Sequence, residues 1–205
     1  MNDYFALLGE PRRPRLEPET LKEKFLQLAA KHHPDKLQNI PAGERQAGQE
    51  SYADLNAAYQ ALREPKSRVQ HLLQLERGEK PRDLQEFPAE LTELFFQISG
   101  ACRQADQTAA ELRATPSALL KVPLFERSEE ISEQIRGLLQ ELERRQNENL
   151  AALKHLDAQW DGPGAEESTK RLLLDQLENI YRLLGFYSKW AESLRQRLLE
   201  LAVIE

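Results

Sequence analysis

The segment of this 205-residue chain that could carry chemistry is a short run of charged and ring-bearing residues, Lys31-His32-His33-Pro34-Asp35-Lys36. Proline fixes the backbone dihedral φ, so we expect the flanking His33 and Asp35 to project outward from a defined corner. The tripeptide alone is a weak signal, and an ordinary proline-terminated turn is the alternative interpretation. Its position between two predicted helices favours a binding surface. Four lysines lie on or beside the first of these helices: Lys22, Lys24, Lys31 and Lys36.

Residues suited to catalysis or metal binding are sparse in the sequence. There is no glycine-rich phosphate loop and no serine or cysteine in a nucleophile context. Adjacent helix residues point about 100° apart, so His32 and His33 would not chelate one metal together. The single cysteine, Cys102, cannot form an internal disulfide or a multi-cysteine metal site. We therefore expect a protein that is not an enzyme and that needs no metal or cofactor.

The charge distribution excludes further classes of function. Residues 1–77 hold 12 Lys/Arg against 11 Asp/Glu, whereas residues 78–205 hold 16 against 23. Nucleic-acid binding needs clustered cations, so this acidic remainder argues against it. The longest apolar run is the five residues Tyr4 to Leu8, whereas a membrane span needs about 20. Because the N-terminal residues also lack a secretory pattern, we expect a cytoplasmic protein.

Helices must position the His-Pro-Asp tripeptide. Apolar residues at helical spacing predict one helix from about Pro18 to His32, which Pro34 would end. A second pattern runs from Tyr52 to Leu62 and stops at Pro65. These two helices would be antiparallel and joined by a polar loop. A short helix at Tyr4 to Leu8 and a third pattern with Val69, Leu72 and Leu73 would flank them.

Longer helices are predicted beyond a polar stretch at residues 76–83, which contains no apolar side chain. Three amphipathic patterns, at 91–112, 131–153 and 173–198, predict an antiparallel bundle. Between the first two, Pro116 and Pro123 bracket an irregular stretch whose Leu119, Leu120 and Val122 are expected to pack back onto the bundle. The predicted fold class is all-α. Its predicted divisions are a domain at 1–77, a linker at 78–83 and a three-helix bundle at 84–205.

Three segments of the sequence resemble the J-domain family, whose members carry His-Pro-Asp between helices II and III. They are the run at 31–36, the opening Asp3-Tyr4-Phe5-Ala6-Leu7-Leu8-Gly9, and the stretch from Asn56 to Arg68. Within this family the chain is most similar to HscB, the iron-sulfur co-chaperone branch. The similarity lies in a long loop after the tripeptide, paired leucines in residues 68–75 and a helical C-terminal domain. The sequence has no Gly/Phe-rich segment and no cysteine-rich zinc module.

The resemblance implies a co-chaperone that docks on the ATP-bound form of a DnaK/HscA-type chaperone and triggers ATP hydrolysis. It implies that Asp35 pairs with an arginine of the chaperone and that His33 and Pro34 fix this geometry. Lysines Lys22, Lys24, Lys31 and Lys36 would steer the encounter, because opposite charge accelerates association. Each lysine taken alone could equally be a solvating residue.

The same resemblance implies a client. HscB proteins present an apolar patch to the iron-sulfur scaffold protein IscU, and by alignment the patch falls on Leu91, Phe95 and Leu173. Leu91 and Phe95 are four residues apart and share a helix face, although such a pair is more often part of a core. HscB proteins continue with a Glu-rich helix, whereas residues 95–101 contain no acidic residue. Two alternatives therefore remain: a J-domain co-chaperone with another client, and a helical interaction protein with an inert tripeptide that forms homodimers through its long helices.

Overall fold

The computed structural model describes residues 2–31, 42–81, 87–160 and 167–204. Across these ranges the chain folds into helices joined by short loops, and no strand occurs among them. The all-α fold class predicted from the sequence is therefore confirmed. The elements are α1 (Tyr4–Leu8), α2 (Pro18–Ala29), α3 (Ala42–Arg63), α4 (Pro65–Arg77), the 3₁₀ turn η2 (Ala89–Leu91), α5 (Thr92–Ala114), α6 (Ala118–Trp160) and α7 (Glu167–Ile204).

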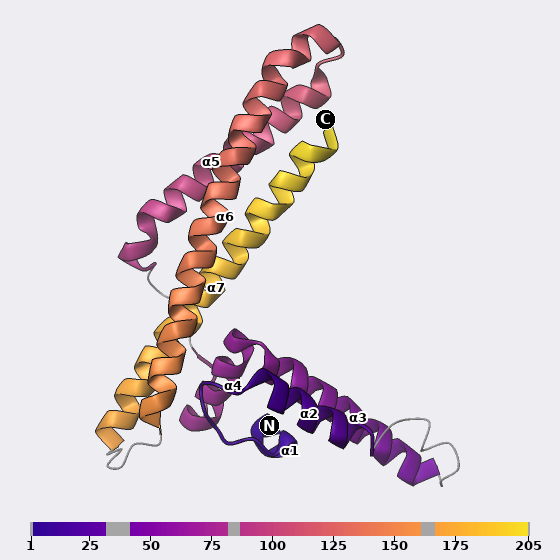
Figure 1. Ribbon diagram of the computed structural model, residues 1–205, viewed down its shortest axis with the longest axis vertical. Coiled ribbons are helices and arrows are strands. Elements are labelled where there is room, and N and C mark those ends of the chain that lie inside the picture. Colours follow the sequence, from indigo (N-terminus) through magenta and orange to yellow (C-terminus); the bar gives the residue numbers. More distant parts are fainter. Residues whose placement is uncertain (1, 32–41, 82–86, 161–166, 205) are drawn as a thin grey trace. The chain divides into compact units, whose positions relative to one another are not determined.

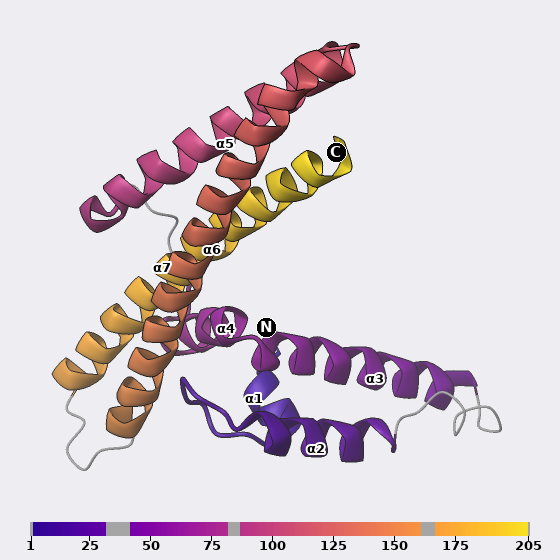
Figure 2. The ribbon, with the colours of Figure 1, turned by 45° about the horizontal axis from the view of Figure 1, so that its top comes forward.

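Helices α2 and α3 form the predicted antiparallel hairpin. Figures 1 and 2 both show the two helices side by side, with α1 against them. The rings of Phe25 and Tyr59 stack between the helices with their centroids 4.4 Å apart. The buried apolar side chains of this part are Phe5, Leu8, Leu16, Leu21, Ala29, Leu55, Ala58 and Leu62.

Helix α1 is short, and its two ends are capped by the residues that flank it. The Asp3 carboxylate accepts hydrogen bonds from the backbone N–H groups of Phe5 and Ala6, at 3.0 and 3.2 Å. These donors belong to the first turn and have no partner within the helix. Gly9 ends the helix at a φ of 64°, a left-handed conformation that glycine adopts without steric cost. The caps explain how a helix of one turn persists at the start of the domain.

The hairpin helices differ in extent from the prediction. Helix α2 ends at Ala29, before the predicted end near His32. The Lys31 N–H bonds to the carbonyl of Leu28, three residues back, and this tighter turn closes the helix. Helix α3 already begins at Ala42, ten residues before Tyr52 opens the apolar pattern. Its first turns hold no large apolar residue, and Gly43, Arg45, Gln46 and Ala47 are exposed there, so apolar spacing could not reveal these turns.

The sequence predicted an irregular stretch between the helical patterns at 91–112 and 131–153. This prediction is wrong from Ala118 onward, where α6 begins. The helix continues through Pro123. Proline there removes one N–H donor, and the carbonyl that loses it belongs to Leu119, whose 80% exposure lets water replace the donor. Leu119, Leu120 and Val122 do not pack back onto the bundle, since all three are at least half exposed.

The chain forms two compact units. One comprises Met1–Arg82 with Leu150–Tyr181, and the other comprises Asp83–Asn149 with Arg182–Glu205. Helices α6 and α7 therefore each contribute to both units. The predicted domain boundaries at residues 77 and 84 divide the chain along its sequence, and they stay a prediction. The two compact units have other boundaries, because the end of α6 and the start of α7 belong to the same unit as the N-terminal helices.

The second unit contains the predicted three-helix bundle. Figure 1 shows α5, α6 and α7 side by side there, and one apolar core joins all three helices. Burying such a shared stripe is the main source of stability for amphipathic helices. The core is formed by Leu91, Leu94, Ile98, Ala101, Ala105, Ala109, Ile131, Ile135, Leu142, Leu183, Tyr187, Ala191, Leu194 and Leu201.

Candidate functional site

The predicted His-Pro-Asp tripeptide falls between α2 and α3 in the sequence. His33, Pro34 and Asp35, together with Lys36, are outside the residues that the structure describes. Of the predicted lysines that are described, Lys22 is exposed on α2 and Lys31 is exposed just beyond its end. Both side chains are therefore available to a partner that approaches α2.

Lys24 has a different environment. Its ammonium group donates a hydrogen bond to the carbonyl of Gly9 at 2.9 Å and pairs with the Glu10 carboxylate at 3.0 Å. The Glu10 side chain is only 8% exposed, so this pair is partly shielded from water. Lys24 thus ties the end of α1 to α2. The proposed role of Lys24 in steering a chaperone stays a prediction.

One exposed apolar residue of α2 was missed by sequence reasoning. Leu26 is 54% exposed and lies four residues after Lys22, so the two side chains share a face of the helix. Its signal was present in the sequence, because Leu26 falls outside the apolar stripe formed by Leu21, Phe25, Leu28 and Ala29. A single exposed apolar residue is ordinary on a protein surface, so Leu26 is a candidate contact only because it shares a helix face with the exposed Lys22.

The position of α2 also depends on a buried arginine. Arg68, on α4, is 6% exposed; its Nε donates to the carbonyl of Pro14 at 2.8 Å and its Nη1 to that of Leu62 at 2.6 Å. Burial lowers the pKa of the Arg68 guanidinium to about 10. Arg68 therefore holds the segment before α2 to the end of α3, with two carbonyl groups offsetting part of the loss of water.

A buried histidine on α4 holds the start of α1. The Nε2 atom of His71 accepts a hydrogen bond from the backbone N–H of Tyr4 at 3.0 Å, and its ring stacks against the rings of Tyr4 and Phe5. His71 is 7% exposed, and burial lowers the pKa of its imidazole below the ordinary value. Asp3 raises this pKa and Arg12 lowers it, both to a smaller extent. Neutral His71 is therefore the form that fits the fold.

This arrangement predicts a pH dependence of stability. As pH falls below the ordinary histidine value of 6.5, the unfolded state binds the proton before the folded state does. The contribution of His71 is thus complete above pH 6.5 and is lost as pH falls toward the lowered folded pKa. Between pH 7.5 and 5.5 the free energy of unfolding should fall by at most about 1.4 kcal/mol per pH unit from this group. Urea unfolding at several pH values measures this slope.

The His71→Gln variant is the control, since glutamine keeps an acceptor at this position and does not titrate. We expect its unfolding free energy to vary less with pH over the same range. Equal slopes in the variant and the wild type would show that His71 does not contribute to the pH dependence.

Aromatic side chains gather at the start of α5 and on α7, within the second unit. The Phe87 ring lies 5.5 Å from that of Phe95 and 5.3 Å from that of Phe186. Trp190 lies 5.5 Å from Phe186, and Phe96 lies 5.7 Å from Phe95, measured between ring centroids. Three of the rings are exposed: Phe87 by 43%, Phe95 by 40% and Phe96 by 64%. We call the five residues of this group the aromatic cluster: Phe87, Phe95, Phe96, Phe186 and Trp190.

Two of the three predicted client residues are buried. Leu91 is completely buried in the core of the second unit, and Leu173 is 4% exposed and belongs to the first unit. Only Phe95 presents much of its side chain to water. Neither Leu91 nor Leu173 exposes its side chain to a partner in this structure. Their role in binding a client stays a prediction.

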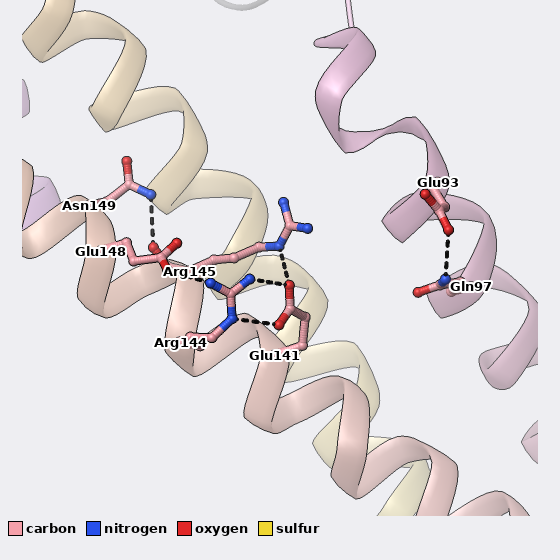
Figure 3. A network of polar contacts seen from close by, with 7 residues as sticks. All are labelled: Glu93, Gln97, Glu141, Arg144, Arg145, Glu148 and Asn149. Carbon is pink, nitrogen blue, oxygen red and sulfur yellow. Dashed lines mark hydrogen bonds and ion pairs between the residues drawn. The ribbon is translucent and has the colours of Figure 1, made fainter.

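Charged residues on α6 form hydrogen bonds and ion pairs with one another. Figure 3 shows the Glu141 carboxylate receiving hydrogen bonds from Arg144, at 2.7 and 2.8 Å, and from Arg145, at 2.6 Å. These bonds lower the pKa of Glu141 to about 2. Arg144 also pairs with Glu148, four residues further on. This surface is a solvated, ion-paired face of the helix, with its acidic groups already occupied.

The described ranges offer neither a metal site nor a membrane-spanning helix. No group of three His, Cys, Asp or Glu side chains there could hold a metal ion. No helix in the same ranges is both long and apolar enough to cross a membrane. The free thiol of Cys102 lies 3.8 Å from the Ser193 hydroxyl, and Cys102 is partly buried.

Comparisons with known proteins agree on the N-terminal helices and on the fold. Residues 3–71 match the family model described as the DnaJ domain. The structure is similar to that of chaperone HscB from Vibrio cholerae, with a TM-score of 0.60 and 20% identity over 95% of this chain and 96% of that one. It is also similar to the human co-chaperone protein HscB, with a TM-score of 0.57 and 18% identity over 96% of this chain and 82% of that one. At these identities the two structures establish the fold alone.

Proposed function

Because the chain carries an N-terminal J-domain on an HscB-like fold, we propose that it is a co-chaperone of a DnaK/HscA-type ATPase in iron-sulfur cluster assembly. This proposal is supported by two matches to known proteins that agree with each other. The DnaJ domain model covers residues 3–71, which include the tripeptide His33-Pro34-Asp35, and the HscB fold covers 95% of the chain. We further propose that the protein is not an enzyme itself and that it acts in the cytoplasm.

In this proposal the J-domain binds the ATP-bound chaperone through the tripeptide and the exposed face of α2. Asp35 pairs with an arginine of the chaperone, and His33 and Pro34 fix its direction. Lys22, Lys31 and Lys36 attract an acidic surface, and Leu26, which is 54% exposed, supplies an apolar contact beside Lys22. A few desolvated contacts inside a charged rim are typical of protein interfaces.

The proposed client is an IscU-like iron-sulfur scaffold protein, and the aromatic cluster is its binding surface. Exposed apolar groups that lie next to one another mark interaction surfaces more strongly than scattered ones do. Aromatic anchors also contribute large contact areas at low cost in conformational entropy. Exposed Glu90 and Glu93 border the cluster on η2 and α5, so an apolar client surface flanked by basic residues would fit it.

A J-domain co-chaperone for a different client is the second candidate. It is favoured by the sequence after Phe95, because α5 lacks acidic residues between Phe95 and Ala101 where HscB proteins are Glu-rich. The test is stimulation of the chaperone's ATPase by this protein, measured with and without the scaffold. Stimulation that the scaffold does not enhance would favour another client. No stimulation at all would favour an interaction protein with an inert tripeptide.

A further inference from the structure

The start of α2 is anchored by a residue far away in the sequence. Glu17, at the N-cap position of α2, makes no side-chain capping bond. The segment immediately before it is held by Asp157, near the end of α6. One carboxylate oxygen of Asp157, Oδ1, accepts hydrogen bonds from Nε of Arg13 at 3.0 Å and from the backbone N–H of Arg15 at 3.1 Å. All of these residues belong to the same compact unit.

Further contacts hold the same segment. Nη2 of Arg13 donates to the backbone carbonyl of Asp157 at 3.3 Å. The indole Nε1 of Trp160, three residues after Asp157, donates to the backbone carbonyl of Arg12 at 2.7 Å. Arg12 in turn pairs with Asp3, the N-cap residue of α1, at 2.7 Å. The end of α6 therefore contacts the backbone of the α1–α2 segment at two points.

The surroundings of Asp157 make its contact stronger than an ordinary surface ion pair. The Asp157 side chain is 16% exposed, and its carboxylate accepts both a charged guanidinium donor and a backbone N–H. Hydrogen bonds to an ionised group are shorter and stronger than neutral ones. A useful contrast is Asp175 in the same unit, which pairs with Arg77 but is 59% exposed. Exposed pairs of that kind contribute little.

We propose that Asp157 is a positioning residue for chaperone stimulation. By holding residues 13–15, it fixes where α2 begins, and hence how Lys22 and Leu26 on α2 are presented. A helix that is held in its binding orientation loses less entropy when the partner binds. The proposal rests on the proposed function, and it assigns a role in the J-domain to a residue outside the segment that matches the DnaJ domain.

The test compares Asp157→Ala with the control Asp175→Ala in the full chain. Asp157→Ala should raise the concentration for half-maximal ATPase stimulation about 3- to 10-fold and leave the maximal rate unchanged, because only presentation of α2 is impaired. It should also speed amide hydrogen exchange at Arg15 and at Leu21, whose N–H bonds to the carbonyl of Glu17 at the start of α2. Asp175→Ala should stay within about two-fold of the wild type, as expected for an exposed pair.

A second variant, Arg13→Gln, removes the guanidinium while Asp157 keeps its bond to the Arg15 N–H. It should shift the half-maximal concentration in the same direction as Asp157→Ala. Arg13→Gln replaces Asp157→Ala as the test if the latter shows no cooperative unfolding transition and is therefore not folded. An unchanged half-maximal concentration, or an equal shift in Asp175→Ala, would overturn the proposal. A wild-type protein that does not stimulate the chaperone would instead overturn the proposed function, so the two failures are distinguishable.

Discussion

Replacing Asp35 by alanine is expected to reduce stimulation of the chaperone's ATPase to about the basal rate. In the proposed complex, the Asp35 carboxylate pairs with an arginine of the chaperone and is removed from water. Truncating one member of such a pair leaves the other charge buried and unpaired, at a cost of about 2–5 kcal/mol. This corresponds to a loss of affinity of about 30-fold or more. Single-turnover ATP hydrolysis at increasing co-chaperone concentration measures the loss.

The matched control for this variant is Asp106→Ala, which removes an exposed carboxylate of the second unit. Asp106 pairs with Arg197 in the second unit and is 51% exposed, so its loss should leave stimulation unchanged. Circular dichroism of Asp35→Ala should equal that of the wild type. Full stimulation by folded Asp35→Ala would show that the tripeptide is not the trigger.

Replacing both Phe95 and Phe96 by alanine is expected to weaken binding of the scaffold about 30-fold or more. An interface aromatic that acts as a hot spot contributes about 2 kcal/mol or more, which is about 30-fold in affinity, so the loss of one such ring of the pair already gives this weakening. Both rings present at least 40% of their surface to water. Because both rings are partly exposed, their loss should destabilise the fold less than the loss of fully buried rings would. Isothermal titration calorimetry with purified scaffold measures the affinity. The ATPase stimulation without scaffold should stay at the wild-type level.

A matched control changes exposed apolar residues elsewhere in the same unit. Leu119 and Leu120 are 80% and 64% exposed, and they follow the far end of α5, roughly 30 Å along the helix from Phe95. Replacing both by serine should leave scaffold binding intact. Equal weakening in the two double variants would mean that general surface apolarity, and not the aromatic cluster, drives binding. Leu91→Ala is unsuitable for this purpose, because Leu91 is completely buried and its loss would leave a cavity in the core.

The arrangement of the helices followed from local sequence signals where these were strong. Asp3 and Gly9 cap α1, and Pro65 opens α4, at positions where these residue types have clear conformational preferences. The start of α6 was missed because Pro123 suggested irregular backbone, whereas the helix tolerates it near a solvated end.

The candidate site was predictable only in part. The tripeptide and the lysines were recognised by their spacing, but the bond between Lys24 and Gly9 shows that one lysine has a structural contact. Spacing also placed Leu91 and Phe95 on one helix face, yet it could not tell which side chain is buried. Asp157 was beyond any local pattern, because the residues that it holds lie 142 and 144 positions away.

In the function that we propose, this protein couples a DnaK/HscA-type ATPase to an iron-sulfur scaffold. The most direct measurement is single-turnover ATP hydrolysis by the chaperone, with this protein alone, with the IscU-like scaffold alone and with both together. We expect this protein to stimulate hydrolysis and the combined stimulation to exceed the sum of the separate effects. Combined stimulation no greater than that sum would contradict the assignment of the client, and a rate unchanged by this protein would contradict the co-chaperone function.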